Sequence, residues 1–361
     1  ASMKNVYLVC NAHLDPVWLW RWQEGCAEAL STFRTAEEII RENKGFVFCH
    51  NEALLYEWVK QYDPALFEQI RQHVREGSWH IMGGWYLQPD CNMPSGESII
   101  RNILMGRAFF EKEFGARPTT AVNFDSFGHS RGLVQILSQS GYEVDVVCRP
   151  GKGHYPFESQ DFIWQGHHHS RVIVHRSVEN YNSVYGHAAE ELSAFLKEKE
   201  KERATLFLWG VGDHGGGPSR RDVKDLSALQ KSGDVPYTLL HATPEAYFQK
   251  LREENTPLPT VAEGLNPVAP GCYTSQIRVK QKHRRLENEL YLTEKMCAAA
   301  AVQKSMAYPA QALAEAQRDL VFSEFHDALP GSGTQLVEED TLEAMDHGLH
   351  ILAREKMKAF A

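Results

Sequence analysis

Near the N-terminus stands VYLVCNAHLDPVW, residues 6–18, in which an apolar run passes directly into polar residues. Residues 6–10 are rich in β-branched and aromatic side chains, which favours a buried strand. His13 and Asp15 follow the end of this strand. Because residues two apart in an extended chain face the same way, both side chains can reach one divalent ion, and mixed nitrogen and oxygen ligands suit zinc. For this pair taken alone, a hydrogen bond between the two is the more common interpretation.

Short apolar runs alternate with amphipathic stretches as far as about residue 262. Further strands are expected at 46–49, 79–82, 120–124, 144–148, 206–211 and 237–240. Helices are expected at 27–42, 53–61, 64–76, 96–114, 133–140, 190–202 and 244–252. This alternation is typical of βα units around a largely parallel sheet. We therefore expect an α/β fold in which seven strands form an irregular (β/α) barrel.

One stretch departs from this alternation. Residues 162–174 have the pattern of a hairpin inserted between barrel strands, and its turn carries His167, His168 and His169. Three histidines at a hairpin turn are more often solvated than bound to a metal, so we expect an exposed surface feature.

The remainder of the chain, after a Pro/Gly-rich join at 257–271, is helical in pattern. Apolar residues recur at three- and four-residue spacing in 276–306, 310–325 and 335–358, which predicts a small three-helix bundle. We expect a barrel domain over 1–265 and a bundle domain over 266–361. Since the sequence stops within a helical pattern, we also expect it to be a fragment of a longer protein.

Composition excludes several classes of function. The net charge of −9 is opposite to what a nucleic-acid partner requires, and no apolar run approaches the roughly 18 residues that span a membrane. The seven cysteines are scattered and include no Cys-x-x-Cys pair, and no signal-peptide pattern opens the sequence. Free thiols favour a reducing compartment, so a cytoplasmic location is expected. The number of chains in the assembly is not decided, and a homo-oligomer stays an open alternative.

Two more expected strands end in carboxylates. Residues 120–124 run into Asp125, and 206–211 run into Asp213 within GDHGGGP, residues 212–218. Barrel enzymes keep their chemistry at such C-terminal strand ends. Taken alone, Asp125 is as well explained as a cap on the next helix. The glycines near Asp213 lack the spacing of a phosphate-binding loop.

A fourth polar segment comes from the predicted bundle. His326 and Asp327 lie in EFHDALPGSGT, residues 324–334, where the second bundle helix ends. A histidine at a helix C-terminus commonly compensates the helix dipole, and this interpretation is the better one for the segment in isolation.

Taken together and in this order, the segments resemble family 38 glycoside hydrolases, the class II α-mannosidases. The resemblance rests on HLDPVW at 13–18, GGW at 83–85, DSFGHS at 125–130, YTS at 273–275, and HDA at 326–328 followed by the GSGT turn. It implies one Zn²⁺, or another divalent metal, held by His13, Asp15, Asp125 and His326. It also implies a substrate that is a mannose-containing oligosaccharide or glycan, and a β-rich region that follows the bundle in the longer protein.

The resemblance further implies a role for each matching residue. Asp125 would attack the anomeric carbon as well as bind the metal, and Asp213 would be the acid/base. Trp18 would lie under the bound sugar, and the first subsite would include Phe127, Arg149 and Asp327. Two positions depart from the family pattern: Asn11 replaces the first histidine of the usual His-x-His-x-Asp, and the Gly-Asp-His at 212–214 differs from the Asp-Phe of the animal enzymes.

A retaining exo-α-mannosidase is therefore the expected function. In such a mechanism the two carboxylates lie about 5 to 5.5 Å apart, and Asp213 needs a raised pKa to act as the acid. One alternative is a metal-dependent carbohydrate deacetylase, which also places histidine and aspartate ligands at barrel strand ends. Another is a sugar-binding fragment that is inactive without a missing C-terminal region.

Overall fold

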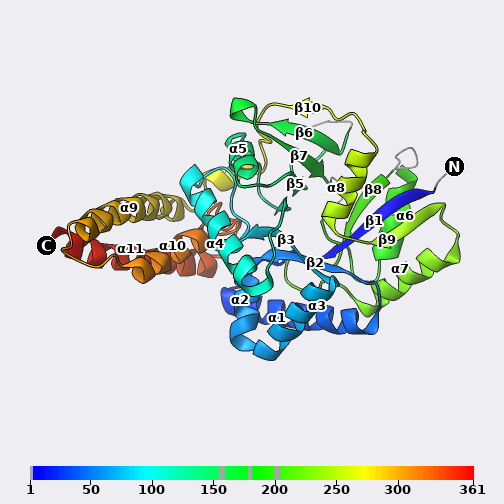
Figure 1. The fold of residues 1–361 in the computed structure, drawn as a ribbon, viewed down its shortest axis with the longest axis horizontal. Coiled ribbons are helices and arrows are strands. Elements are labelled where there is room, and N and C mark those ends of the chain that lie inside the picture. The colour runs from blue at the N-terminus through cyan, green and yellow to red at the C-terminus, as the bar shows by residue number, and fades with distance from the viewer. Residues whose placement is uncertain (1–2, 154–158, 178–180, 199–203) are drawn as a thin grey trace.

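The computed structural model describes residues 3–153, 159–177, 181–198 and 204–361. Within these ranges the chain forms a mixed α/β body, from which a bundle of three long helices projects on one side (Figure 1). The N-terminus lies at the far side of the α/β body, and the C-terminus lies at the outer end of the bundle. The described part contains eleven α-helices and two five-stranded sheets.

The first sheet is built around β1 (Lys4–Asn11), whose residues from Val6 onward are all buried. β1 pairs in parallel with β8 (Ala204–Trp209) along most of its length and with β9 (Tyr237–His241) along its first half. At its C-terminal end it pairs with β2 (Phe48–Glu52), which pairs in turn with β3 (Trp79–Trp85). Strands in a parallel sheet that is covered on both faces carry nearly continuous apolar runs, as residues 6–10 of β1 and 206–209 of β8 do.

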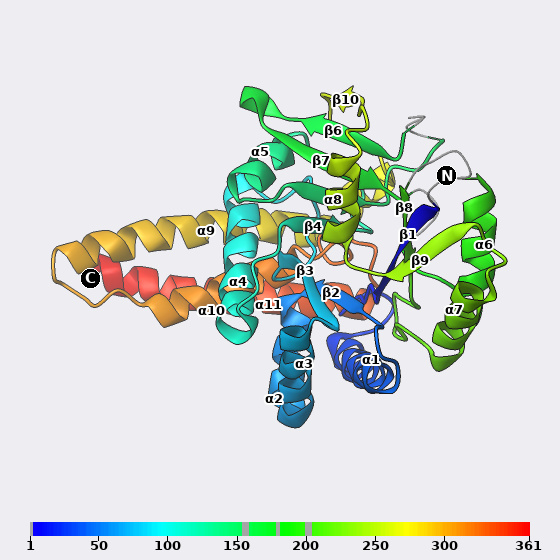
Figure 2. The same ribbon diagram turned by 45° about the vertical axis from the view of Figure 1, so that its right-hand side comes forward.

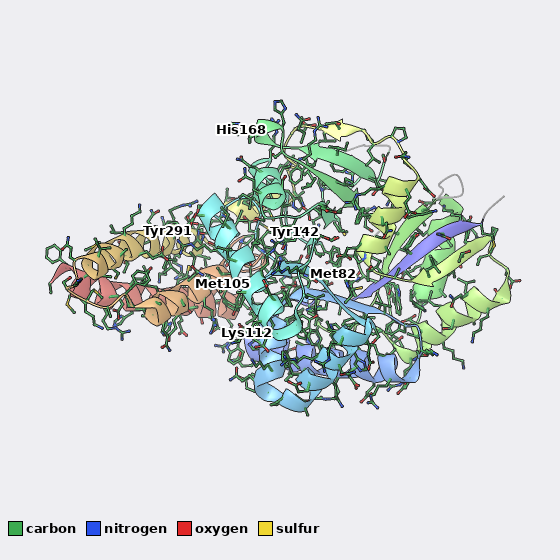
Figure 3. The ribbon with its side chains drawn as sticks, in the orientation of Figure 1. Met82, Met105, Lys112, Tyr142, His168 and Tyr291 are labelled. Carbon is green, nitrogen blue, oxygen red and sulfur yellow. The ribbon has the colours of Figure 1, made fainter. Side chains whose placement is uncertain are left out.

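The second sheet has the order β10–β6–β7–β5–β4. Its members are β4 (Thr120–Asn123), β5 (Val144–Val147), β6 (Asp161–Gln165), β7 (Arg171–Arg176) and β10 (Thr260–Val261). β6 and β7 form an antiparallel hairpin, as predicted from 162–174. His167, His168 and His169 are exposed at its turn, and Figure 3 shows His168 at the outer edge of the molecule. The prediction of a solvated surface feature is confirmed.

The seven-stranded barrel is not confirmed. All seven predicted strands form, yet the backbone hydrogen bonds divide the strands into two sheets, and none of the described ladders joins β3 to β4. β3 and β4 only lie beside each other. The hairpin β6–β7 and the short β10 add three members to the second sheet that the alternation of strand and helix patterns did not count.

All described helices of the α/β body except α7 lie close to predicted positions. The helices are α1 (Trp22–Glu42), α2 (Ala53–Tyr62), α3 (Pro64–Glu76), α4 (Gly96–Phe114), α5 (Gly132–Gln139), α6 (Ala188–Glu198), α7 (Arg220–Ser232) and α8 (Pro244–Glu253). The prediction omitted α7, whose sequence is rich in charge and buries only a narrow face through Val223 and Leu226. The predicted helix at 190–202 extends beyond α6, and its residues 199–202 lie outside the described ranges.

The bundle consists of α9 (Ile277–Val302), α10 (Ala310–Ser323) and α11 (Gln335–Phe360), which lie side by side in both ribbon views (Figure 2). Its own apolar core is formed by residues at helical spacing on the facing sides, including Leu286, Leu290, Leu320, Met345 and Leu352. None of the helices in the described ranges is both long and apolar enough to cross a membrane.

Helix α4 approaches β3 closely enough to control the segment that follows this strand. A Cβ atom added at Gly106 would lie 2.0 Å from the carbonyl oxygen of Gly84, so only glycine permits this contact. One turn earlier, the Asn102 side chain accepts from the backbone N–H of Tyr86 and donates to the carbonyl of Leu87. The segment after β3 is thereby held on the helix.

Candidate metal and active site

The C-terminal ends of β1 and β8 lie next to each other and carry His13, Asp15 and Asp213. The backbone N–H of Asp213 donates to the carbonyl of His13 at 2.5 Å, and the N–H of Asp15 donates to the carbonyl of Asp213 at 2.9 Å. These bonds continue the pairing of two buried parallel strands past their ends. His13 and Asp15 are buried, with His13 Nε2 3.0 Å from Asp15 Oδ1.

Asp125 follows β4, at the carboxyl end of a strand of the second sheet. The residue is 9% exposed, and Oδ1 accepts from both Nε (2.8 Å) and Nη2 of Arg149. The Arg149 guanidinium also lies over the Phe127 ring, 5.6 Å from its centroid. The three residues therefore form one contact group, in which a cation holds one oxygen of the carboxylate.

Asp213 has a strained backbone and a partly buried side chain. Its φ of 65° lies in the left-handed region that aspartate adopts at a cost, which is common where function dictates geometry. Tyr181 donates through its hydroxyl to Asp213 Oδ1 at 3.0 Å. Burial raises the pKa of Asp213, while the nearby His13 and the Tyr181 hydroxyl act in the opposite direction. This carboxyl is more easily protonated than an exposed one.

His326 and Asp327 reach this region from the bundle. The loop after α10 docks on the segment after β3, where Asp90 N–H donates to the carbonyl of Glu324 at 2.8 Å. His326 is fully buried, and its Nε2 lies 3.2 Å from Asp15 Oδ1. Ser332 donates to Asp327 Oδ1 at 2.6 Å. The bundle thus contributes side chains to a cluster whose other members come from strand ends.

Two sets of three potential ligands share His326. One is His13, Asp15 and His326, and the other is Asp125, His326 and Asp327; within each set the donor atoms lie within 4.8 Å of one another. His13 Nε2 and Asp327 Oδ2 are buried atoms without a hydrogen-bond partner, since the close approach of His13 to Asp15 lacks hydrogen-bond geometry. Two imidazoles and several carboxylates with orphaned donor atoms fit a divalent ion such as zinc.

The charges in the cluster are strongly coupled. Burial alone lowers the pKa of each imidazole, but Asp15 outweighs it and helps to raise the pKa of His13 to about 9 and that of His326 to about 10. Burial would raise the pKa of Asp15, yet His13 and His326 bring it down to about 2. Burial and the neighbouring Asp15 raise the pKa of Asp327 to about 7. Positive charge is therefore strongly favoured beside Asp15.

Trp18 lies outside these two sets of ligands. It lies partly exposed on the loop after β1, with its ring 5.7 Å from that of Trp20 in an edge-on arrangement. Its carbonyl accepts from the N–H of Thr334 at 2.9 Å, which ties this loop to the start of α11.

Three further residues of this site were not predicted from the sequence: Glu52, Gln88 and Tyr181. Glu52 and Gln88 are fully buried and hydrogen-bonded to each other beneath the two histidines, and burial raises the pKa of Glu52. The Tyr181 ring packs edge-on against the His13 ring at 4.8 Å. Glu52 is the last residue of β2 and Gln88 lies shortly after β3, so a polar residue near a strand end was the available signal. Tyr181 follows no described strand or motif.

A third buried group, His283, Glu287 and Glu324, also has donor atoms close together. Here the carboxylates already have partners. Glu287 accepts from Ser98 Oγ at 2.6 Å and from Ser95 N–H at 2.9 Å, and His283 Nε2 lies 2.9 Å from Glu324 Oε1. This group joins α4 to the bundle and fixes the end of α10 just before His326.

Comparison with known families gives two adjacent matches. Residues 3–266 match the glycosyl hydrolases family 38 N-terminal domain, and residues 270–358 match the alpha mannosidase middle domain. Alpha-mannosidase G of Dictyostelium discoideum is 31% identical over 347 residues, which are 95% of this chain and 32% of that protein. Alpha-mannosidase 2C1 of Homo sapiens is 30% identical over 351 residues, 96% of this chain and 33% of that protein. The chain spans about a third of the length of these relatives.

Among solved structures, an alpha-mannosidase from Enterococcus faecalis V583 superposes with a TM-score of 0.83 at 21% identity. The match covers 98% of this chain and 42% of that one, and it supports a shared fold. The two alternatives expected from the sequence, a carbohydrate deacetylase and an inactive sugar-binding fragment, are not favoured by these comparisons.

Proposed function

Because this chain belongs to glycosyl hydrolase family 38, we propose that it carries the catalytic site of a retaining exo-acting α-mannosidase, which removes terminal α-linked mannose from oligosaccharides or glycans. The observation that carries the proposal is the convergence of His13, Asp15, Asp125 and His326 from two strand ends and the bundle. Asp213 is the partly buried carboxyl of raised pKa beside them. The curated relatives are named as alpha-mannosidases, which supports the substrate class.

In the proposed site, His13, Asp15, Asp125 and His326 hold a divalent ion, for which two imidazoles and two carboxylates favour Zn²⁺. When bound, this ion supplies positive charge that can hold vicinal hydroxyls of the sugar. We also propose the division into a barrel-like domain over 1–265 and a bundle over 266–361, with the bundle completing the ligand set. The scattered cysteines, which form no disulfide in the described ranges, support the proposal of a cytoplasmic location.

In the proposed reaction, one carboxyl group acts in its ionised form and the other in its protonated form. Asp125 attacks the anomeric carbon and forms a covalent glycosyl-enzyme, while Arg149 holds its Oδ1 in place. Asp213 gives its proton to the leaving oxygen and afterwards takes a proton from the attacking water. Trp18, Phe127 and Asp327 are proposed to contact the sugar, Trp18 through its ring face.

The proposal is tested by trapping the intermediate with a fluorinated mannosyl donor that forms the glycosyl-enzyme quickly and releases it slowly. We expect a mass increase of one fluoromannosyl group on the peptide that carries Asp125. A deacetylase would gain no such adduct, because it activates water and forms no bond to the sugar. Turnover of aryl α-mannoside without any adduct on Asp125 would contradict the proposed nucleophile.

Asp213→Asn is expected to affect substrates according to their leaving groups. Asparagine cannot donate the proton, so kcat/KM for an alkyl or glycan mannoside should fall by about 10²- to 10⁴-fold. The dinitrophenolate of a dinitrophenyl mannoside leaves without being protonated. This substrate should therefore form the glycosyl-enzyme at close to the normal rate. The check is steady-state and burst kinetics with both substrates, and equal losses for the two would speak against an acid role.

Tyr181→Phe is expected to move the alkaline limb of the pH profile to higher pH. Asp213 acts as an acid only while protonated, so kcat/KM falls as pH rises through its pKa. The Tyr181 hydroxyl donates to the ionised form and stabilises it, so its removal should raise the pKa of Asp213 further. The measurement is kcat/KM against pH for both proteins, and an unchanged or lowered limb would exclude this link.

A further inference from the structure

Gln88 lies at the centre of the contacts beneath the proposed ligands. It follows β3, is fully buried, and sits between the end of β2 and the loop that brings His326 from the bundle. Its side-chain Nε2 donates to Glu52 Oε1 at 3.0 Å, and its backbone N–H donates to Glu52 Oε2 at 3.3 Å. A single carboxylate therefore holds both the main chain and the side chain of Gln88.

The hydrogen-bond partners determine which way the Gln88 amide points. The backbone N–H of Phe124 can only donate, and it lies 3.0 Å from Gln88 Oε1. The amide oxygen must therefore face Phe124, which leaves Nε2 for Glu52. In this orientation Nε2 also lies 3.4 Å from Nδ1 of His13. Nδ1 carries the ring hydrogen when His13 binds a metal through Nε2, so it accepts no hydrogen bond from Gln88 in that state.

The main-chain carbonyl of Gln88 orients the histidine from the bundle. It accepts from the backbone N–H of His326 at 3.3 Å and lies 3.1 Å from Nδ1 of the same residue. A carbonyl can only accept, so Nδ1 carries a hydrogen. In the neutral ring Nε2 is then the unprotonated nitrogen, and it faces Asp15.

Two of the four proposed ligands are reached by hydrogen bonds that suit a bound ion. The carbonyl of Gln88 holds His326, and through Phe124 N–H its amide oxygen fixes the backbone immediately before Asp125. Partners of this kind set the ring orientation and the tautomer of metal-binding histidines. We propose that Gln88, clamped by Glu52, is the positioning residue that holds the metal ligands from β4 and the bundle in one arrangement.

This inference rests on the proposed function, since it assumes the metal site. The first test is Gln88→Met, which keeps the length of the side chain and removes its amide. We expect affinity for Zn²⁺ to fall by about 10- to 100-fold, measured by competition with a chromophoric chelator on folded protein. The carbonyl contact to His326 remains in this variant, so a partial loss is expected.

Asn102→Leu is the matched control. Asn102 is equally buried and also hydrogen-bonds the segment after β3, but its side chain bonds Tyr86 and Leu87 and none of the proposed ligands. We expect this variant to lower the unfolding temperature and to keep the Zn²⁺ affinity of the folded protein. Gln88→Met should lower both quantities.

A second test exchanges the Gln88 and Glu52 side chains. Because glutamine and glutamate have nearly the same volume, this test changes the hydrogen bonds and charge and leaves the packing nearly unchanged. Gln88→Glu alone places two buried carboxylates against each other and should weaken Zn²⁺ binding. Adding Glu52→Gln restores one amide and one carboxylate: the new amide can donate to the carboxylate at position 88, which still accepts from Phe124 N–H. We expect the double variant to regain most of the affinity that Gln88→Glu loses.

The outcomes separate this inference from the proposed function. Failure of the unaltered protein to bind Zn²⁺ would overturn both. Zn²⁺ binding by the unaltered protein, with the same affinity in Gln88→Met, would overturn the positioning role alone. An equal loss of affinity in Asn102→Leu, or a double variant no better than Gln88→Glu, would likewise reject a specific role for the Gln88 amide.

Discussion

Asp125→Asn is expected to abolish hydrolysis of α-mannosides and to weaken metal binding in the same protein. Asparagine has no charged oxygen to attack the anomeric carbon, so kcat should fall on the order of 10⁴-fold or more. It also removes one negative charge from the ligand set and leaves Arg149 without its carboxylate partner. The measurements are kcat on an aryl α-mannoside and bound metal per chain by mass spectrometry.

Asp161→Asn is the matched control for this result. Asp161 has the same 9% exposure as Asp125 and also bonds a basic side chain, His175, and a tyrosine hydroxyl, Tyr247, but it lies on β6 outside the two sets of proposed ligands. We expect a loss of stability with kcat and metal content kept. Near-normal turnover by Asp125→Asn, or a comparable loss in Asp161→Asn, would refute the assignment of Asp125.

Removal of the divalent ion is expected to abolish turnover and to destabilise the fold. The proposed ligands come from β1, β4 and the loop after α10, so the bound state links three separate segments. An ion at a thousandfold excess over its Kd stabilises the native state by about 4 kcal/mol, provided that the unfolded chain does not bind it. Thermal unfolding with increasing Zn²⁺, starting from chelator-treated protein, measures this shift.

The contribution of the bundle can be separated with two histidine variants. His326→Ala should remove the dependence of the unfolding temperature on metal. His347→Ala, which alters an exposed histidine elsewhere on the bundle, should preserve it. Hydrogen exchange should then show faster opening of residues 324–334 in the metal-free protein. If the unfolding temperature of the unaltered chain does not change with metal concentration, the proposed metal link between the bundle and the strand ends is contradicted.

The sequence predicts those parts of the site that follow directly from local pattern. His13, Asp125 and Asp213 each come just after an apolar run, and the period of the run is enough to place them at a strand end. His326 is different, because its local context is equally that of a helix terminus. Only the order of all the motifs along the chain brought it into the ligand set.

The features that the sequence did not predict depend on contacts between distant segments. Gln88 is significant because it contacts His326, which lies 238 positions further along the chain. A local pattern of apolar and polar residues carries no information about a contact over that separation. Tyr181 reaches Asp213 across 32 positions in the same way. The division into two sheets depends on which strands exchange backbone hydrogen bonds, and seven strand patterns in series are equally compatible with a closed barrel.

The meeting of Asp15 with His326 has a consequence for how the protein is made. These residues are 311 positions apart in the chain and 3.2 Å apart in space. At about 5 to 20 residues per second, the ribosome needs roughly 15 to 60 seconds to pass from one to the other. During that interval the nascent chain presents His13 and Asp15 without their third partner. On the proposed ligand set, the ion is acquired only after the bundle has been translated, so metal loading is a late step in biogenesis.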